Sequence, residues 1–276
     1  MRLPPTLRPP ELPAASQAML RGARRLLRRK DRYLAGCFLA EGRQAVSEAL
    51  GRPGTVIEVI VADDSVGPHQ ELLSTASDAG ARIAVAPARA VTELSATVTP
   101  QGLVAVCNMI DVSPVEALAG VPRLAVFCDQ IRDPGNLGTV IRCADAFGAD
   151  AVLISRDSVD VYNAKTVRAT TGSLFHLPLA IDLDLAEAVT LARDSGLQVL
   201  GADPTAPDKI NDLARSGKLA QSTMWVMGNE AWGLTPEHAS LLDQLVALPL
   251  YGRAESLNLS TAAAVLLYAS ATAQRS

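Results

Sequence analysis

The chain has 276 residues, of which 49% are apolar and 4% aromatic. It can therefore form one large domain or two ordinary domains, each with a hydrophobic core. No apolar stretch is long enough to span a membrane, and prolines and arginines occupy the N-terminus where a secretory signal would be apolar. The four cysteines are scattered without a C-x-x-C pair. These features argue against a membrane protein, a disulfide framework and a metal site, and they predict a reduced, cytoplasmic protein.

The net charge of −4 gives no sign of a nucleic-acid partner, but the distribution of charge does. Residues 1–32 contain nine basic and two acidic residues, a net charge of +7. Such asymmetry is typical of proteins that bind a polyanion. A solvated helix face explains the same basic run equally well, so the charge pattern alone leaves both interpretations open.

The first half of the chain predicts a small α/β domain. Residues 1–16 are rich in proline and are expected to form a flexible arm. Residues 17–30 place apolar residues among arginines at helical spacing, which predicts one amphipathic basic helix. The elements expected after it are a strand followed by a helix over 37–50, a helix over 70–80, and strands over 55–63, 81–86 and 102–110. Residues 111–122 contain two prolines without clear periodicity and are interpreted as a linker.

The second half alternates strands and helices more regularly. Its expected strands are residues 123–129, 151–155, 176–181, 197–203, 223–228 and 245–250. This alternation predicts a mostly parallel sheet that is covered by helices on both faces. Ligands of such sheets bind beyond the carboxyl ends of the strands. That rule directs attention to the loops that follow residues 129, 228 and 250.

The first of these loops opens the stretch DPGNLGTVIRCADAFG, Asp133 to Gly148. Its apolar residues from Leu137 onward have helical spacing, and Asn136 is expected to cap the helix. A helix N-terminus favours phosphate through its unpaired N–H groups and its dipole. Arg142 falls on the side of the helix opposite the apolar residues. Alone, this stretch is also explained as an ordinary strand, turn and helix with a solvated arginine.

The other two loops carry further polar and glycine-containing segments. MGNEAWGL, Met227 to Leu234, places Gly228 and Glu230 directly after a strand. LPLYGRAESLNLS, Leu248 to Ser260, ends a strand, and Ser256 or Asn258 is expected to start the C-terminal helix. A surface turn with an acidic residue and a capped, alanine-rich helix would account for each segment separately. The chain has no G-x-G-x-x-G, P-loop or G-x-S-x-G motif, which disfavours a nicotinamide-dependent α/β enzyme and a serine hydrolase.

Together and in this order, the three segments resemble the signature motifs of the SpoU (TrmH-like) RNA 2′-O-ribose methyltransferases of the SPOUT superfamily. The resemblance covers residues 123–276 and extends more weakly to residues 17–110, which are similar to the family's ribosomal-protein-like substrate-binding domain. It implies an α/β catalytic domain whose C-terminal segment forms a deep trefoil knot, an exception to the rule that chains avoid knots. It further implies a homodimer that acts on RNA with S-adenosyl-L-methionine as cofactor.

The resemblance also assigns roles to individual residues. The cofactor-binding positions it implies are Met227, Gly228, Asn229, Leu248, Leu250 and Leu257. The catalytic positions it implies are Asn136, Arg142, Glu230, Ser256 and Asn258. Leu250 stands where the family more often has methionine.

A ribose hydroxyl is a poor nucleophile until its proton is being removed. An arginine is protonated at all accessible pH values, so we expect Arg142 to bind phosphate, to stabilise the developing alkoxide, or to act with a neighbour. Asn136 and Ser256 are expected to position the ribose and phosphate, and Glu230 to orient Arg142 or Asn258.

In this context the basic N-terminal segment is expected to contact RNA phosphates. The ligands expected there are Arg28, Arg29, Lys30 and Arg32. The two-domain layout favours ribosomal RNA, 23S rRNA in particular. Transfer RNA is the alternative substrate, and a non-catalytic RNA-binding protein on the same fold is the alternative function.

Overall fold

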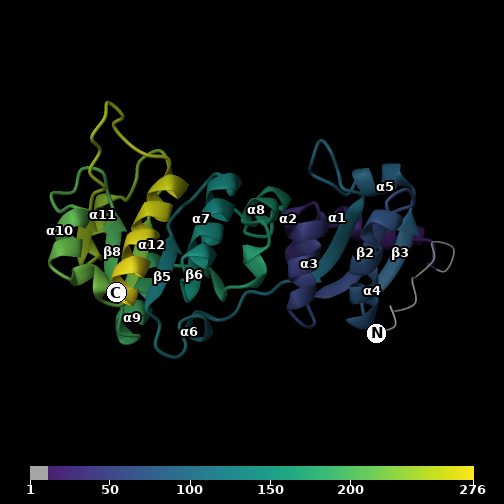
Figure 1. Cartoon of the computed structure of the whole chain (residues 1–276), viewed down its shortest axis with the longest axis horizontal. Coiled ribbons are helices and arrows are strands. Elements are labelled where there is room, and N and C mark those ends of the chain that lie inside the picture. Colours follow the sequence, from purple (N-terminus) through teal and green to yellow (C-terminus); the bar gives the residue numbers. More distant parts are fainter. Residues whose placement is uncertain (1–11) are drawn as a thin grey trace. The chain divides into compact units, whose positions relative to one another are not determined.

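A computed structural model describes residues 12–276, and these form two compact units (Figure 1). The first unit contains the described residues up to Ile110 together with Asp160–His176. The second unit contains Asp111–Val159 and Leu177–Ser276. Most of the expected N-terminal arm, residues 1–11 of 1–16, lies outside the described residues. The described end of that arm pairs with the first unit, since Ala15 N donates to Val85 O at 2.8 Å.

The first unit has a mixed sheet in the order β1-β4-β2-β3. Only β2 and β3 pair in parallel. The strands of this sheet are β1 (Cys37–Glu41), β2 (Val56–Ala62), β3 (Arg82–Ala86) and β4 (Leu103–Asn108). The helices of this unit are α1 (Gln17–Arg25), α2 (Arg29–Ala35), α3 (Arg43–Gly51), α4 (Gln70–Asp78), α5 (Ala88–Thr92) and α8 (Ala164–Thr170). Leu20, Ala23 and Leu26 share a core cluster with Leu39 and Ile60 of the sheet.

The prediction of one continuous helix over residues 17–30 is wrong. The α1 helix ends at Arg25, and Arg28 is extended (φ −100°, ψ 132°) before α2 begins. The break leaves the carbonyl of Leu26 without a helical partner, and Arg32 Nη1 donates to that carbonyl at 2.9 Å. A buried side chain of α2 thus satisfies a carbonyl at the end of α1. The periodicity of residues 17–30 cannot indicate such a contact.

Arg32 also forms a buried ion pair with Asp160, which lies 128 residues later in the chain. Its Nε donates to Asp160 Oδ2 at 3.1 Å, and Nη2 donates to the same oxygen. The other carboxylate oxygen accepts from the Tyr33 hydroxyl at 3.3 Å and from Tyr162 N at 3.0 Å. The Tyr162 ring packs 4.7 Å from the ring of Phe38 in β1. These contacts make Asp160–His176 part of the core of the first unit.

The second unit has a sheet in the order β10-β8-β9-β5-β6-β7, and every neighbouring pair is parallel. Its strands are β5 (Leu124–Cys128), β6 (Ala151–Ser155), β7 (Leu179–Leu183), β8 (Gln198–Ala202), β9 (Thr223–Met227) and β10 (Gln244–Val246). Its helices are α6 (Pro114–Ala117), α7 (Pro134–Ala146), α9 (Leu185–Asp194), α10 (Ile210–Arg215), α11 (Pro236–Ser240) and α12 (Leu259–Arg275). No helix within residues 12–276 is long and apolar enough to cross a membrane.

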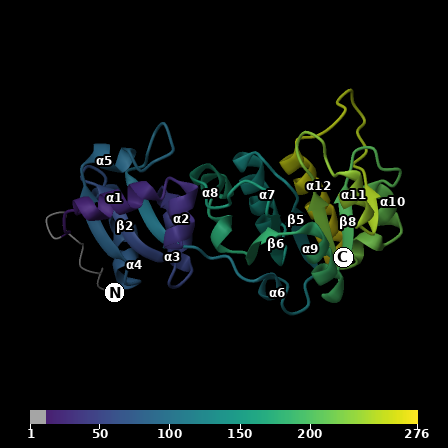
Figure 2. The ribbon, with the colours of Figure 1, turned by 180° about the vertical axis from the view of Figure 1, so that it is seen from behind.

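Helices cover both faces of this sheet, as the sequence predicts. On one face Phe127 and Val226 share a core cluster with residues of α6 and α9. On the other face α7 and α12 pack against each other and against β5 (Figures 1 and 2). Trp225 is fully buried in β9, and its Nε1 donates to Ser270 Oγ of α12 at 2.9 Å. Burial on both faces explains why these strands appear in the sequence as continuous apolar runs.

The chain order of the strands reverses between β5 and β9, which are neighbours in the sheet. From β5 the chain continues to β6 and β7 on one side, whereas from β9 it continues beyond β8 to β10 on the other. Such a switch point is where open parallel sheets bind their ligands.

The buried Arg32–Asp160 pair gives a stability prediction. Replacing Arg32 with methionine leaves the Asp160 carboxylate buried without its counter-ion, so we expect a loss of about 3–5 kcal/mol in the free energy of unfolding. Urea unfolding followed by far-UV circular dichroism measures this loss. The control is Arg25→Met, because Arg25 pairs with Asp31 but its side chain is 66% exposed, and we expect a change within about 0.5 kcal/mol. Equal effects of the two substitutions would contradict the prediction.

Candidate active site

A pocket of about 690 Å³ lies in the second unit at the carboxyl ends of its strands. All three predicted loop segments contribute to its lining. The lining residues that the sequence predicts to be functional are Asn136, Met227, Gly228, Asn229, Glu230, Leu248, Leu250, Ser256, Leu257 and Asn258. The pocket has the size of an ordinary small-molecule site.

Glu230 connects the loop after β9 to the start of α7. Its Oε1 accepts from Asp133 N at 3.1 Å and from Asn136 Nδ2 at 3.2 Å, and its Oε2 accepts from Arg132 N at 3.1 Å. Two loops that are about 100 residues apart in the sequence are therefore joined by one carboxylate.

These contacts keep the Glu230 carboxyl ionised. Desolvation by burial, the largest single influence, raises the pKa of Glu230, but the hydrogen bonds from Arg132, Asp133 and Asn136 together bring this pKa below its ordinary value. Both oxygens are occupied as acceptors. Glu230 is therefore a structural anchor at neutral pH and a poor proton acceptor.

Asn136 extends this connection to the third segment. Its Oδ1 accepts from Asn258 Nδ2 at 3.0 Å, while Asn258 Oδ1 accepts from Ser260 N at 2.9 Å and from Thr261 N at 3.4 Å. Asn258 is thus the N-cap of α12, one of the two residues expected there. Glu230, Asn136 and Asn258 form one chain of hydrogen bonds across the three segments.

The prediction that Asn136 caps α7 is wrong, because Asp133 is the N-cap of that helix. Asp133 Oδ1 accepts from Asn136 N at 2.9 Å, and Pro134 occupies the first turn of α7. Asn136 consequently lies within the first turn of the helix. Its side chain does not cap the helix and instead forms hydrogen bonds with Glu230 and Asn258.

The loop after β9 is tightly folded around Gly228. Asn229 and Gly233 exchange two backbone hydrogen bonds of 2.9 Å each, and Asn229 Nδ2 donates to Gln130 O at 2.7 Å. A Cβ atom at Gly228 would lie 2.6 Å from the carbonyl carbon of Gly233. Glycine is therefore required here for space, and the backbone of this loop forms part of the pocket wall.

Two family profiles match this chain. The profile of the SpoU rRNA Methylase family matches residues 123–268, and a profile described as RNA 2′-O ribose methyltransferase substrate binding matches residues 39–112. The chain belongs to the SpoU rRNA methylase family. The family resemblance of the three motifs is thereby confirmed.

Relatives with named activities share most of the chain. The 23S rRNA (guanosine(2553)-2′-O)-methyltransferase RlmP of Bacillus subtilis is 34% identical over 258 residues, which is 94% of this chain and 98% of the relative. A 23S rRNA (uridine(2479)-2′-O)-methyltransferase of Streptomyces viridochromogenes is 32% identical over 93% of this chain and 92% of its own. The crystal structure of the SpoU methyltransferase AviRb from Streptomyces viridochromogenes in complex with AdoMet has a TM-score of 0.80 and 29% identity. It covers 94% of this chain and 99% of AviRb.

Two groups of residues for which the sequence predicts a function lie outside the pocket lining. Arg142 is exposed on α7, nearly two turns after Asn136. In the first unit, Arg28, Arg29 and Lys30 are exposed at the start of α2. Arg32, predicted with them, is buried and engaged by Asp160 and Leu26, which leaves no free face of its guanidinium for a phosphate.

The segment after β8 lines the pocket as well, although the sequence patterns do not single it out. Ala202, Asp203, Pro204 and Thr205 lie in the lining beside the loop after β9. The sequence predicts the strand over 197–203, and the rule for parallel sheets applies to its carboxyl end as well. The segment that follows carries none of the glycine and asparagine signals that mark the other loops. Ala262 and Leu266 of α12 also line the pocket.

The space around Gly228 can be tested by substitution. We expect Gly228→Ala to lower the free energy of unfolding by about 1–3 kcal/mol, because the added methyl group collides with the backbone of Gly233. Urea unfolding followed by tryptophan fluorescence measures the effect, since both tryptophans, Trp225 and Trp232, belong to the second unit. The control is Gly252→Ala, where a Cβ meets nothing within 4 Å, and we expect it to change stability by less than about 1 kcal/mol. A Gly228→Ala protein as stable as the control would contradict this account of the loop.

Proposed function

We propose that this protein transfers a methyl group from S-adenosylmethionine to a ribose 2′-hydroxyl of 23S ribosomal RNA. The observation that carries the proposal is the pocket at the carboxyl ends of the strands, where the hydrogen-bonded chain Glu230–Asn136–Asn258 joins all three motif segments. The named activities of the Bacillus subtilis and Streptomyces viridochromogenes relatives support 23S rRNA as the substrate.

The pocket residues fit S-adenosylmethionine. Apolar side chains of Leu248, Leu250 and Leu257 line it beside the backbone of Gly228 and Asn229, which suits an adenosine that is recognised by shape and by main-chain groups. The AdoMet complex of AviRb supports the same cofactor. When bound, the cofactor supplies a methyl group on a sulfonium, which makes that carbon electrophilic.

The chain's own residues would align the acceptor and stabilise charge. Asn136 and Ser256 border the pocket and would hold the ribose and its phosphate. Glu230 acts on them indirectly, through its hydrogen bond with Asn136. Arg142 is a permanent cation and would bind a phosphate or the oxygen that gains negative charge as the 2′-proton leaves.

We further propose that the protein is a homodimer with a trefoil knot in its catalytic domain. Val265 and Tyr268 are large apolar residues that α12 exposes, and Tyr268 packs edge-on against Phe147 at 5.7 Å. An exposed apolar face of this kind suits a subunit contact. The small residues Ala262 and Ala263 at the start of α12 suit the close packing that a threaded segment needs. A cytoplasmic location fits the four cysteines, which form no disulfide.

Methyl transfer tests the main proposal. Purified protein is incubated with radiolabelled S-adenosylmethionine and, separately, with ribosomal RNA and transfer RNA. We expect label in ribosomal RNA and a rate that falls by about 100-fold or more in Arg142→Ala, since a charge that stabilises the transition state is lost. Arg215→Ala, at an exposed position of α10, is the control and should keep the wild-type rate. Label in transfer RNA alone would assign the other substrate, and RNA binding without any label would exclude the enzyme.

RNA contact by α2 has its own test. We propose that Arg28, Arg29 and Lys30 bind RNA phosphates, and Arg32 is left out because it is buried. The double substitution Arg28→Gln and Arg29→Gln should reduce the slope of log affinity against log salt by about 1.5–2, because two counterion-releasing contacts are lost. Filter binding at several salt concentrations measures the slope. Arg82→Gln with Arg89→Gln removes the same charge from exposed positions of the first unit. An equal change in both double variants would contradict a local contact.

A further inference from the structure

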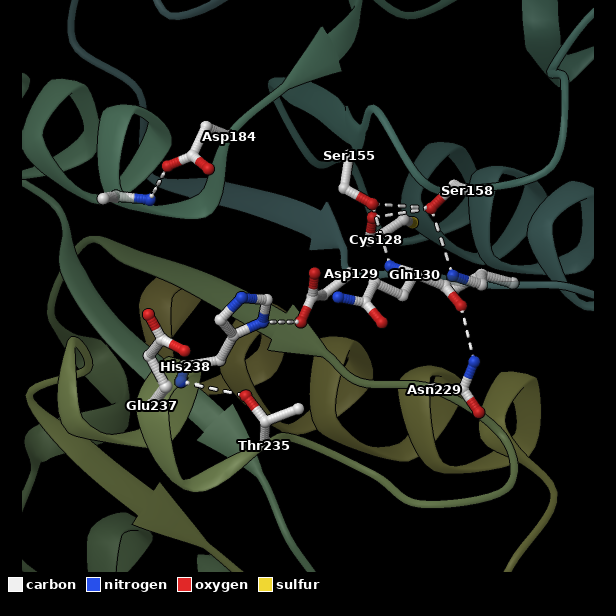
Figure 3. Close-up of polar contacts among 12 residues, drawn as sticks. Cys128, Asp129, Gln130, Ser155, Ser158, Asp184, Asn229, Thr235, Glu237 and His238 are labelled. Carbon is white, nitrogen blue, oxygen red and sulfur yellow. Dashed lines mark hydrogen bonds and ion pairs between the residues drawn. The ribbon is translucent and has the colours of Figure 1, made fainter.

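A buried aspartate and a histidine form a pair beside the pocket that the proposed mechanism does not use. Asp129 follows β5 and is 3% exposed. Its Oδ2 lies 2.6 Å from Nδ1 of His238 in α11 (Figure 3). A carboxylate oxygen can only accept, so the ring nitrogen carries the proton. Neither residue lines the pocket.

The pair lies at one end of a short segment, residues 129–133, that is hydrogen-bonded along its whole length. On one side, Gln130 N donates to Ser155 Oγ at 2.8 Å and Ile131 N donates to Ser158 Oγ at 3.1 Å (Figure 3). Gln130 has a φ of 53°, in the left-handed region that disfavours residues other than glycine. These contacts hold a strained backbone in place immediately before α7.

On the other side, the same segment is held by the chain that follows β9. Asn229 donates to Gln130 O, and Glu230 accepts from Arg132 N and Asp133 N. These contacts fix the near end of the loop that begins at Gly228. His238 lies beyond the far end of that loop, in α11, where Thr235 Oγ1 accepts from His238 N at 3.2 Å. The far end of the loop is held by the Asn229–Gly233 backbone pair and by the buried Leu234, and the Asp129–His238 contact joins the helix just beyond it to the end of β5.

The surroundings of Asp129 make its contact with His238 sensitive to charge. Acidic groups near it come from the two adjoining loops, Asp157 after β6 and Asp184 before α9. Desolvation by burial is the main cause of a raised pKa at Asp129; the hydrogen bond and charge of His238 lower this pKa, and Asp157 and Asp184 raise it. His238 is thus the basic group that offsets the unfavourable surroundings of the carboxylate.

We propose that Asp129 and His238 are a positioning pair for methyl transfer. Their contact holds the loop from Gly228 to Leu234 closed against the start of α7, and thereby keeps the wall of the cofactor pocket in register with Asn136. The pair touches neither cofactor nor substrate and acts through the two loops that it joins. This inference rests on the proposed function, because the pocket it shapes is the proposed S-adenosylmethionine site.

The test is the affinity for S-adenosylhomocysteine, measured by isothermal titration calorimetry with the full chain at pH 7.5. We expect His238→Leu to raise the Kd about tenfold, as a buried hydrogen bond to a charged group is lost. His238→Asn should restore most of the affinity, because its amide nitrogen can take the place of Nδ1. Thermal melting of each variant confirms that it is folded at the temperature of the titration.

A matched histidine–carboxylate pair provides the control. His176 Nε2 lies 3.1 Å from Glu48 Oε2, and both residues belong to the first unit. His176→Leu therefore breaks a pair of the same chemistry away from the pocket. It should leave the Kd for S-adenosylhomocysteine unchanged.

The pH profile separates positioning from a general loss of stability. In His238→Leu the Kd should fall from about pH 8 down to about pH 5, since protonation relieves a carboxylate that is buried without a partner. The double variant Asp129→Asn/His238→Leu lacks that carboxyl and should show no such fall. If His238→Leu fails to fold, Asp129→Asn replaces it in the comparison of Kd, because it removes the charged partner of His238 without changing the size of the side chain.

The outcomes are distinguishable from one another. A wild-type protein that does not bind S-adenosylhomocysteine overturns the proposed function and this inference with it. Wild-type binding together with an unchanged Kd in His238→Leu overturns the positioning pair alone. A raised Kd in His238→Leu that falls on acidification and that His238→Asn rescues supports it.

Discussion

A carboxylate set against the first turn of a helix holds together the loops that form the candidate site. Glu230 accepts two backbone N–H groups and the amide of Asn136 at the start of α7, where the helix dipole also favours a negative charge. Asn136 then accepts from Asn258, the cap of α12. One acid thus fixes the relative positions of three segments that lie far apart in the sequence. The lining of the pocket follows from this constraint, because each segment contributes part of it.

The parallel sheet explains why these segments meet at all. Neighbouring parallel strands end at the same edge, so the loops after β5, β8, β9 and β10 all emerge there. The loops after β5 and β9 are bonded to each other through Glu230 and Asn229, and the pocket opens among the segments that follow β8, β9 and β10. The space is then lined by apolar side chains and closely folded backbone, as at Gly228, where not even a methyl group fits. The fold therefore determines where the loops meet, and the hydrogen bonds of a few side chains hold these loops together.

Local patterns predicted the strands β5, β6, β8 and β9 and the three loops, because strands buried on both faces are continuous apolar runs and their breaks are marked by glycine and asparagine. At the edges of the sheet, β7 (Leu179–Leu183) and β10 (Gln244–Val246) are displaced from the strands expected over 176–181 and 245–250. They failed where a partner distant in sequence decides the outcome. Arg32 resembled a phosphate ligand, but Asp160, 128 residues away, buries it. The break between α1 and α2 depends on the same side chain. Asn136 was expected to cap α7, although Asp133, three residues earlier, is an equally good cap and leaves Asn136 free for the site.

The charges of the pocket restrict how the 2′-hydroxyl can lose its proton. Two carboxylates line the pocket, and their surroundings differ: Glu230 accepts on both oxygens from the start of α7, whereas Asp203 accepts from Thr205 N and Oγ1, at 2.7 and 2.6 Å, on Oδ1 alone. A carboxylate with donors on both oxygens and a lowered pKa, as at Glu230, is a weak base. Glu230 therefore serves the reaction by aligning the acceptor, and a nearby positive charge can stabilise the oxygen that loses the proton. Arg142 is exposed on α7 outside the pocket lining, so in the proposed reaction its charge acts on the RNA from outside the pocket wall.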